Sequence, residues 1–285
     1  LAKFLRDENV VTSLQFDGFT DHVYTKLRGR KLKKQKIHIL NLLRKLNAPM
    51  SLVCTLVKSV NEGEIKEILR LFLNSDNILS LMIQPMAYAG QGKNFTHKVT
   101  ERITIPDAIK LVAENSGGLI KEEDFLSLPC SHPLCFSLTF LLKLSSGGFI
   151  PINRFVKLDE YFDSIKNKPI FGLERNEFER IRKLVYDLWS GPLGCVPEGK
   201  KILETIRVLI KEADKTRFEA GKLFNLGEKS IKSIFIHHFM DSETFDLSRA
   251  RKCCNAYPQS NGALMPACVF NVLRRGSKLS IPKDF

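Results

Sequence analysis

The 285-residue chain lacks the long apolar run of a membrane helix and the cysteine content of a disulfide framework. A spanning helix needs about 20 consecutive apolar residues, and the longest candidate, residues 133–144, has only the length of a buried helix. Seven cysteines, an odd number, do not suit a secreted domain held together by disulfides. Lys3, Arg6 and Asp7 interrupt the opening segment, which therefore does not match a signal peptide. We expect a cytoplasmic protein.

The chain has a globular composition with unevenly placed charge. Hydrophobic residues make up 44% and charged residues 26%, which is enough for a sizeable core and excludes general disorder. The net charge of +13 lies entirely in residues 1–48 and 249–285, and residues 26–45 hold nine basic residues and no acidic one. Such a segment attracts phosphate or is simply a solvated helix face. Stacking aromatics are missing from it, Tyr24 being the nearest, so we expect no nucleic-acid partner.

Apolar patterns predict alternating strands and helices over the first hundred residues. Continuous apolar runs at 10–16, 50–57 and 79–84 predict buried strands. The apolar spacing at 39–46 and 65–72 predicts the intervening helices, the second with Asn61 as its N-cap and Glu64 as capping-box partner. This order predicts parallel strands joined by right-handed crossovers, as in part of an α/β barrel or an open sheet.

Beyond residue 100 the chain is predicted to be mostly helical. Pro106 is well placed to begin a helix that ends near Gly117. Helical spacing recurs at 178–188 and 206–213, and residues 231–239 are a late strand candidate.

Two cysteines lie in a proline-stiffened segment, LPCSHPLC, at residues 128–135. We expect Cys135 to begin an apolar helix, 136–142, whose dipole and free N–H groups would stabilise a thiolate. His132, between Cys130 and Cys135, is a further potential ligand. The alternative is a pair of inert buried cysteines.

Three more cysteines lie near the C-terminal end, at Cys253, Cys254 and Cys268. A turn between them would bring Cys268 beside Cys254, so the chain offers five clustered thiols for the four positions of a metal centre. The irregular spacing slightly favours an iron–sulfur cluster over zinc, because the paired C-x-x-C knuckles of structural zinc sites are missing. His237 and His238 should point to opposite faces of a strand, so at most one can reach such a site.

Short motifs along nearly the whole chain are similar to those of one enzyme family. They are SLQFDG, LRG, LVKSVNEGEI and IQPMAYAGQG near the start, LPCSHPLC in the middle, and FMD, TFDL, the CC pair, YP, NG and the PxC that ends at Cys268. Together they resemble a radical S-adenosylmethionine family that contains the archaeal tetraether lipid synthases and archaeal enzymes once read as pterin methylases. The resemblance implies an α/β fold, with part of a (β/α)6 barrel in residues 1–100 and a mostly helical domain in residues 101–285.

The resemblance also implies an enzyme that uses S-adenosylmethionine and an auxiliary 4Fe-4S cluster. Its expected reaction is the joining of isoprenoid lipid chains by hydrogen abstraction and C–C bond formation. The alternatives are a radical methyltransferase acting on a pterin-like ring and a non-catalytic iron–sulfur or zinc protein. The implied cluster ligands, one of them spare, are Cys130, Cys135, Cys253, Cys254 and Cys268. The implied S-adenosylmethionine contacts are Gln15, Thr55, Lys58, Asn61 and Gln84; ordinary strand-end capping is the alternative role for each.

The chain departs from the family in one motif. The C-x-x-x-C-x-x-C triplet that binds the radical-generating cluster is missing, and the first residue is Leu1 rather than Met. We expect a fragment of a longer enzyme, inactive by itself. If the substrate is a membrane lipid, the basic segments are expected to hold the protein at an anionic membrane surface, at about 1 kcal/mol per basic residue.

Overall fold

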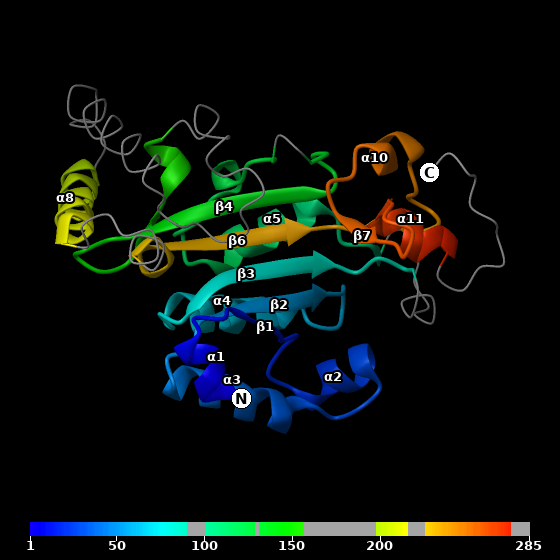
Figure 1. The fold of residues 1–285 in the computed structure, drawn as a ribbon, viewed down its shortest axis with the longest axis horizontal. Helices are drawn as coiled ribbons and strands as arrows, with labels where there is room; N and C mark the ends of the chain where they lie inside the picture. Colours follow the sequence, from blue (N-terminus) through cyan, green and yellow to red (C-terminus); the bar gives the residue numbers. More distant parts are fainter. Residues whose placement is uncertain (90–100, 129–130, 157–197, 216–225, 275–285) are drawn as a thin grey trace.

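Six strands form one sheet in a computed structural model that describes residues 1–89, 101–128, 131–156, 198–215 and 226–274 (Figure 1). Their order across the sheet is β1-β2-β3-β6-β4-β5, and a second, small sheet pairs β7 with β8. The strands are β1 (Thr12–Gln15), β2 (Met50–Leu56), β3 (Ile78–Pro85), β4 (Phe136–Lys143), β5 (Phe149–Pro151), β6 (Ile231–His237), β7 (Ala256–Pro258) and β8 (Leu264–Pro266). The α-helices are α1 (Ala2–Asp7), α2 (Asp21–Arg28), α3 (Lys33–Lys45), α4 (Ile65–Leu73), α5 (Ile105–Asn115), α8 (Gly199–Lys215), α10 (Leu247–Arg251) and α11 (Ala267–Val269).

The sheet is mostly parallel. β1, β2, β3 and β6 run in one direction, whereas β4 is antiparallel to β6 and β5 is antiparallel to β4. The predicted strands at 10–16, 50–57, 79–84 and 231–239 are confirmed as β1, β2, β3 and β6. The α/β class is therefore confirmed, but the strands form an open row with β1 and β5 at its edges, so the described residues do not show the expected barrel.

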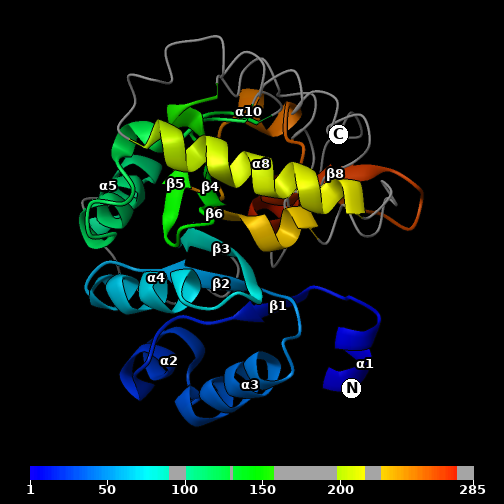
Figure 2. The same cartoon turned by 90° about the vertical axis from the view of Figure 1, so that its left-hand side faces the viewer.

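Helices α3, α4 and α5 bury their apolar sides against strands β1, β2, β3 and β6 in one continuous core (Figure 2). The predicted α4 stripe is confirmed, since Ile65, Ile68 and Phe72 are fully buried. The predicted stripe on α3 is partly wrong: Leu40 and Leu43 face the core, while Ile39 and Leu42 are exposed. Helix α5 begins at Ile105 with Pro106 in its first turn, as predicted, and Thr104 with Asp107 forms its capping box.

The segment after Cys135 is strand β4, so the predicted helix at 136–142 is wrong. Its residues pair along the whole length of β6, from Phe136 opposite His237 to Leu142 opposite Ile231. A short apolar run does not distinguish a buried strand from a buried helix, and here the open edge of β6 decides the outcome. The described part of 101–285 contains five strands, so it is less helical than expected. One sheet thus includes strands from both sides of residue 100, and the division into two domains stays a prediction.

Lys232 connects strand β6 with the segment between α4 and β3, which comes from the first hundred residues. This buried side chain at the start of β6 donates from Nζ to the backbone carbonyls of Phe72, Ser75 and Ile78, at 2.9, 2.8 and 2.5 Å. The first two carbonyls lie at the C-terminal end of α4, where cations are favourable. Burial lowers the pKa of Lys232 to about 7, while three acceptors suit the three donors of its ammonium form.

Helix α8 and the C-terminal elements lie at opposite ends of the sheet (Figure 1). Ile202 and Ile206 of α8 pack on Leu142 and Ile150 of the β4–β5 hairpin, so the helix predicted at 206–213 is confirmed. The helix predicted at 178–188 lies outside the described residues.

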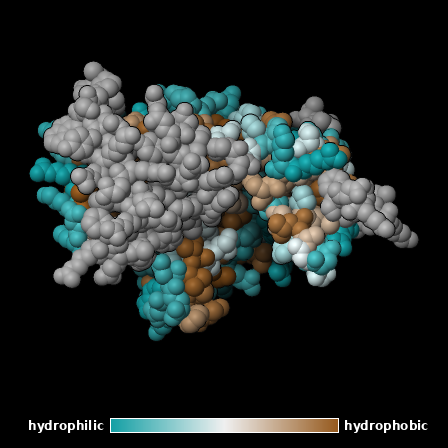
Figure 3. All heavy atoms as spheres, turned by 45° about the horizontal axis from the view of Figure 1, so that its top comes forward, coloured by the Kyte–Doolittle hydropathy of each residue, from teal (hydrophilic) through white to brown (hydrophobic). Residues whose placement is uncertain are grey.

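Apolar side chains reach the surface beside hydrophilic ones near the C-terminal elements, at the right of Figure 3. In the C-terminal elements, Leu264 of β8 is the most exposed large hydrophobic residue, and Tyr257 of β7 and Leu247 of α10 are also exposed. Among the helices of the described residues, none has both the length and the apolar character required to cross a membrane.

Candidate functional site

Functional side chains gather at the carboxyl ends of the parallel strands, the edge where ligands bind in open α/β sheets. Because β4 runs antiparallel to β6, the residues before β4 also lie at this edge, beside the residues that follow β6. Three centres are found there in the described part of the chain. One follows β1 and β2, one joins the loops after β3 and β6, and one is a cavity that contains cysteines.

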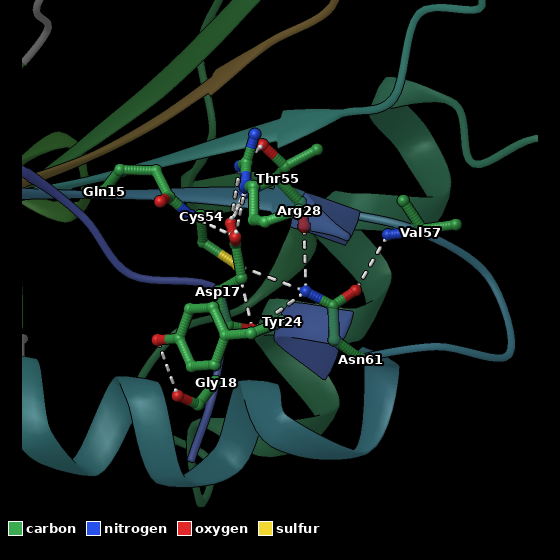
Figure 4. Close-up of polar contacts among 9 residues, drawn as sticks. All are labelled: Gln15, Asp17, Gly18, Tyr24, Arg28, Cys54, Thr55, Val57 and Asn61. Atoms are coloured by element: carbon green, nitrogen blue, oxygen red, sulfur yellow. Dashed lines mark hydrogen bonds and ion pairs between the residues drawn. The ribbon is translucent and has the colours of Figure 1, made fainter. Parts of the chain in front are cut away.

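The first centre is built around Asp17, a fully buried carboxylate directly after β1 (Figure 4). It accepts hydrogen bonds from the Thr55 backbone N–H at 2.9 Å and from Arg28 Nε and Nη2 at 2.9 and 3.2 Å, and a short one from Gln15. Arg28 Nη2 also donates to Thr55 Oγ1 at 2.9 Å. A buried carboxylate needs such partners, so Asp17 and Arg28 together lock the ends of β1, β2 and α2.

Asn61 completes this centre. It is the N-cap residue of the 3-10 helix Glu62–Glu64, so its predicted position is confirmed, but the predicted side-chain cap is not formed. Its side chain makes no cap; Oδ1 accepts from the Val57 N–H at 2.8 Å, and Nδ2 donates to the carbonyls of Asp17 and Thr55 at 2.9 and 2.8 Å (Figure 4). Glu64, the predicted capping-box partner, instead accepts from the backbone N–H of Phe19 at 3.0 Å. These long-range backbone acceptors and donors outcompete the local cap.

The residues predicted to contact S-adenosylmethionine are only partly brought together. Thr55 and Gln84 are direct partners on β2 and β3, and Gln15 lies on neighbouring β1. Lys58 is exposed in the turn after β2, while Asn61 is buried and uses its amide on the backbone. Their role toward S-adenosylmethionine stays a prediction.

The second centre joins the loops after β3 and β6 through a buried ion pair. Asp241 is fully buried and accepts from the Tyr88 N–H at 3.0 Å, from Thr244 Oγ1 at 3.0 Å, and through a short contact from Arg102. Arg102 also donates to Glu243 at 2.6 Å. Burial disfavours the charged carboxylate, but these hydrogen bonds outweigh burial and hold the pKa of Asp241 below its ordinary value. Asp241, the last residue of the FMD motif, therefore holds the loop after β6 in place through these hydrogen bonds.

The third centre is a cavity of about 710 Å³ that contains four of the five predicted cluster cysteines. Cys135 reaches it from the residue before β4, and Cys253 and Cys254 reach it from the end of α10. The β7–β8 hairpin then turns the chain back, so that Cys268 in α11 reaches the same cavity, as the sequence predicted. The remaining lining includes Met82, Leu128, Ser131, His132, Phe136, Phe235, His237, His238, Phe239, Met240, Arg249, Lys252 and Asn255.

Two of these sulfurs receive hydrogen bonds. Arg249 Nη2 donates to Cys135 Sγ at 3.1 Å, and the Met240 backbone N–H donates to Cys268 Sγ at 3.3 Å. Burial is the main cause that raises the pKa of Cys268 to about 11, and Cys253 and Cys135 contribute. Without a metal, Cys268 is therefore a neutral thiol at pH 7.

Both histidines of the HH pair line the cavity, so the prediction that only one could reach it is wrong. Strand β6 ends at His237, and the alternation of faces no longer applies to His238. His237 lies against Phe239 with ring centroids 4.1 Å apart and against Phe136 at 5.4 Å. Burial lowers the pKa of His237 to about 4, so the imidazole is neutral at pH 7.

The metal prediction itself is neither confirmed nor contradicted by this geometry. Cys130 lies outside the described residues, so the fifth thiol is not placed. In the described part of the chain, no three His, Cys, Asp or Glu side chains are grouped closely enough to hold a single metal ion. The thiolates of a cubane cluster bind different irons and stand farther apart than the ligands of one ion, so this test does not decide between the alternatives.

Sequence reasoning missed the two buried acidic centres. The sequence shows Asp17 only within the SLQFDG motif and Asp241 only within the FMD motif. In both cases the available signal was an acidic residue shortly after an apolar run. The arginine partners are not evident from the sequence, because Arg28 lies 11 residues from Asp17 and Arg102 lies 139 residues from Asp241. No local pattern connects Asp241 with Arg102.

No family model matches the chain. A curated relative from Methanocaldococcus jannaschii, named 7,8-dihydro-6-hydroxymethylpterin dimethyltransferase, is 29% identical over 305 aligned positions. The alignment includes 95% of this chain but only 58% of the relative. The chain is thus similar to somewhat more than half of a pterin-modifying enzyme.

Proposed function

We propose that this chain is part of a radical S-adenosylmethionine methyltransferase that acts on a pterin-like ring. The observation that carries the proposal is the convergence of Cys135, Cys253, Cys254 and Cys268, from three separate segments, on one cavity at the ligand-binding edge of the sheet. The similarity to the dimethyltransferase supplies the substrate class and favours the pterin alternative over the joining of lipid chains.

The cysteine cavity fits a 4Fe-4S cluster in the chemistry of its donors. Thiolates are the usual ligands of such clusters, and N–H groups directed at sulfur stabilise the ligated form. Arg249 and the Met240 N–H already direct such donors at two of the thiols. Four of the five thiols of Cys130, Cys135, Cys253, Cys254 and Cys268 would hold the cluster, and any one of them can be the spare one. A bound cluster of this kind supplies one-electron chemistry or a binding point for substrate.

The cavity also has room for a flat ring beside the thiols. Its volume of about 710 Å³ lies within the range of small-molecule sites, which suits a bicyclic ring better than two long isoprenoid chains. Phe136, Phe239 and the neutral His237 offer ring faces for stacking, and His237 can exchange hydrogen bonds without charge.

We propose that S-adenosylmethionine binds at the ends of strands β1, β2 and β3, next to the cysteine cavity. Gln15, Thr55, Lys58, Asn61 and Gln84 are the candidates, with Asn61 acting by positioning Thr55 rather than by contact. Gln84 donates to the sulfur of Met82 at 3.1 Å, and Met82 lines the cysteine cavity, so the two sites adjoin. The printed sequence holds no C-x-x-x-C-x-x-C, so a radical-generating cluster would need ligands outside it.

Anaerobic reconstitution with iron and sulfide tests the cluster. We expect about four irons per chain and a broad visible absorption, as for one cubane held by cysteines. Cys268→Ala and Cys135→Ala should lose both signals. Cys54→Ala is the matched control, because Cys54 is buried beside Asp17 and does not line the cavity.

Titration with a reduced pterin, followed by quenching of its fluorescence, tests the substrate class. Saturable binding that is weakened by Phe239→Ala, but not by Phe4→Ala at an exposed position, would support it. Stoichiometric zinc without sulfide would contradict the cluster and favour a zinc-binding protein. Cluster assembly without any pterin binding would contradict the substrate class alone.

A further inference from the structure

A second cavity, of about 730 Å³, lies between the end of β1 and the helices α2 and α3 and shares no lining residue with the cysteine cavity. Four of its lining side chains are cationic and two are amides, while no acidic side chain appears among the described lining residues. The polar lining is Gln15, Lys26, Arg28, Arg30, Gln35 and Lys36. Gly29 caps the C-terminal end of α2. Its positive φ of 71° turns the chain, so that the last turn of α2 and the first turn of α3 both border the cavity.

Arg28 is held rigidly in this cavity. Asp17, itself fully buried, accepts from Nε and Nη2, and Thr55 Oγ1 accepts from Nη2 as well (Figure 4). Nη1 has no such partner within the described residues. A guanidinium that is fixed on one side and open on the other is prepared to bind an oxyanion, since little side-chain entropy remains to be lost.

The other three cations have no acidic partner among the described residues. No salt bridge within the described part of the chain involves Lys26, Arg30 or Lys36. Burial lowers the pKa of Lys36; the buried carboxylate of Asp17 acts in the opposite direction, and repulsion from Arg28 and Arg30 adds to the lowering. The cations are thus near enough to repel one another, and a bound anion would relieve that repulsion.

We propose that this cavity binds a phosphate group carried by a larger molecule. Arg28 would donate from its open Nη1 to a phosphate oxygen, and Arg30, Lys26 and Lys36 would neutralise the charge of the phosphate. The volume far exceeds that of one phosphate, and Leu27, Leu32 and Ile39 provide an apolar wall for the rest of the ligand. The ligand is either a free phosphate ester or the phosphate of a lipid headgroup. The described lining holds no aromatic ring, which disfavours stacked bases of nucleic acid.

Calorimetric titration with pyrophosphate at constant ionic strength tests the site. We expect saturable binding to one site per chain, weakened about tenfold or more in the double variant Arg30→Gln/Lys36→Gln. The matched control is Arg44→Gln/Lys45→Gln, which removes the same charge from the exposed last turn of the same helix α3 and should bind like the unmodified chain. Arg28 is left unchanged, because it balances the buried Asp17.

Flotation with vesicles that contain phosphatidic acid distinguishes the two sources. Binding that is lost in the first variant, retained in the second and displaced by pyrophosphate would identify a lipid headgroup. Pyrophosphate binding without vesicle binding would identify a free phosphate ester. The proposal is overturned by equal loss in both variants, by absence of saturable binding, or by displacement of pyrophosphate by S-adenosylmethionine, which would assign the cavity to that cofactor.

Discussion

Replacing Asp241 by Asn should open the cysteine cavity without unfolding the core. Asp241 accepts from donors on both sides of its carboxylate: Arg102 and the Tyr88 N–H on one oxygen, and the N–H groups of Glu243 and Thr244 on the other. The amide oxygen of an asparagine can accept the hydrogen bonds of one carboxylate oxygen, but the amide NH2 group then faces the N–H donors that bound the other oxygen. The change also leaves the buried Arg102 without its principal counter-charge.

The expected cost is about 3–5 kcal/mol, the range for removing one member of a buried charged pair. Because Met240 donates to Cys268, loss of the Asp241 anchor should free the loop that covers this thiol. A change of about 3 kcal/mol raises the open population by roughly a hundredfold or more. Opening also restores the ordinary acidity of Cys268, whose pKa burial has raised to about 11, so more reactive thiolate forms at pH 8.

Thiol alkylation at pH 8, followed by peptide mass spectrometry on protein freed of iron, measures this directly. Cys268 should react at least tenfold faster in Asp241→Asn, while the buried Cys54 of β2 stays protected. Asp246→Asn is the matched control, since it makes the same charge change in the same loop but keeps a good N-cap for α10. Equal acceleration at Cys54 would mean global unfolding, and an unchanged rate at Cys268 would refute the anchoring role.

Two buried polar side chains of the core give further outcomes, measured as free energies of unfolding in urea. Asn61→Ala removes three hydrogen bonds to the backbone and should cost about 3 kcal/mol, whereas Asn115→Ala, which loses one bond within its own helix, should cost about 1 kcal/mol or less. Asn61→Asp should be less stable at pH 8 than at pH 5. The carbonyl oxygens of Asp17 and Thr55 raise the folded-state pKa of the new carboxyl, so the free energy of unfolding falls as the pH rises through that pKa. A pH profile as flat as that of the unmodified chain would contradict this. Lys232→Met should cost about 3 kcal/mol by removing three hydrogen bonds to backbone carbonyls, although those of Phe72 and Ser75 keep a backbone donor. Lys229→Met, at an exposed position, should change the stability little.

The three strands of the first hundred residues and the helices α3 and α4 could be predicted because they are specified locally, whereas helices α1 and α2 were not predicted. A buried parallel strand is a continuous apolar run, and helix α4 shows the full 3.6-residue stripe at Ile65, Ile68, Leu69 and Phe72. The stripe of α3 was harder, because long apolar side chains such as Ile39 and Leu42 occur on its solvent side as well. Apolar periodicity identifies the core-facing side of a helix only where the solvent-facing side is polar.

The thiols of the candidate site were identified from composition and spacing, but their supporting groups were not. Cys253, Cys254 and Cys268 are close enough in the chain for a turn to suggest their meeting. Arg249 bonds to Cys135 across 114 residues and Asp241 to Arg102 across 139, and only the sheet topology brings such pairs together. One sequence contains no signal for contacts of this range.

The antiparallel direction of β4 accounts for the position of Cys135 in the cysteine cavity. A parallel strand at this position would have started at the far end of the sheet, near α8, and Cys135 would have lain a full strand length from Cys268. Strand pairing fixes Cys135 against the end of β6, where its carbonyl accepts from the His238 N–H at 2.9 Å. Cys253, Cys254 and Cys268 instead depend on the Asp241 loop and a hairpin of two three-residue strands. A cluster that bridges both groups would therefore spend part of its binding free energy on ordering residues 238–268, which couples metal loading to the stability of this segment.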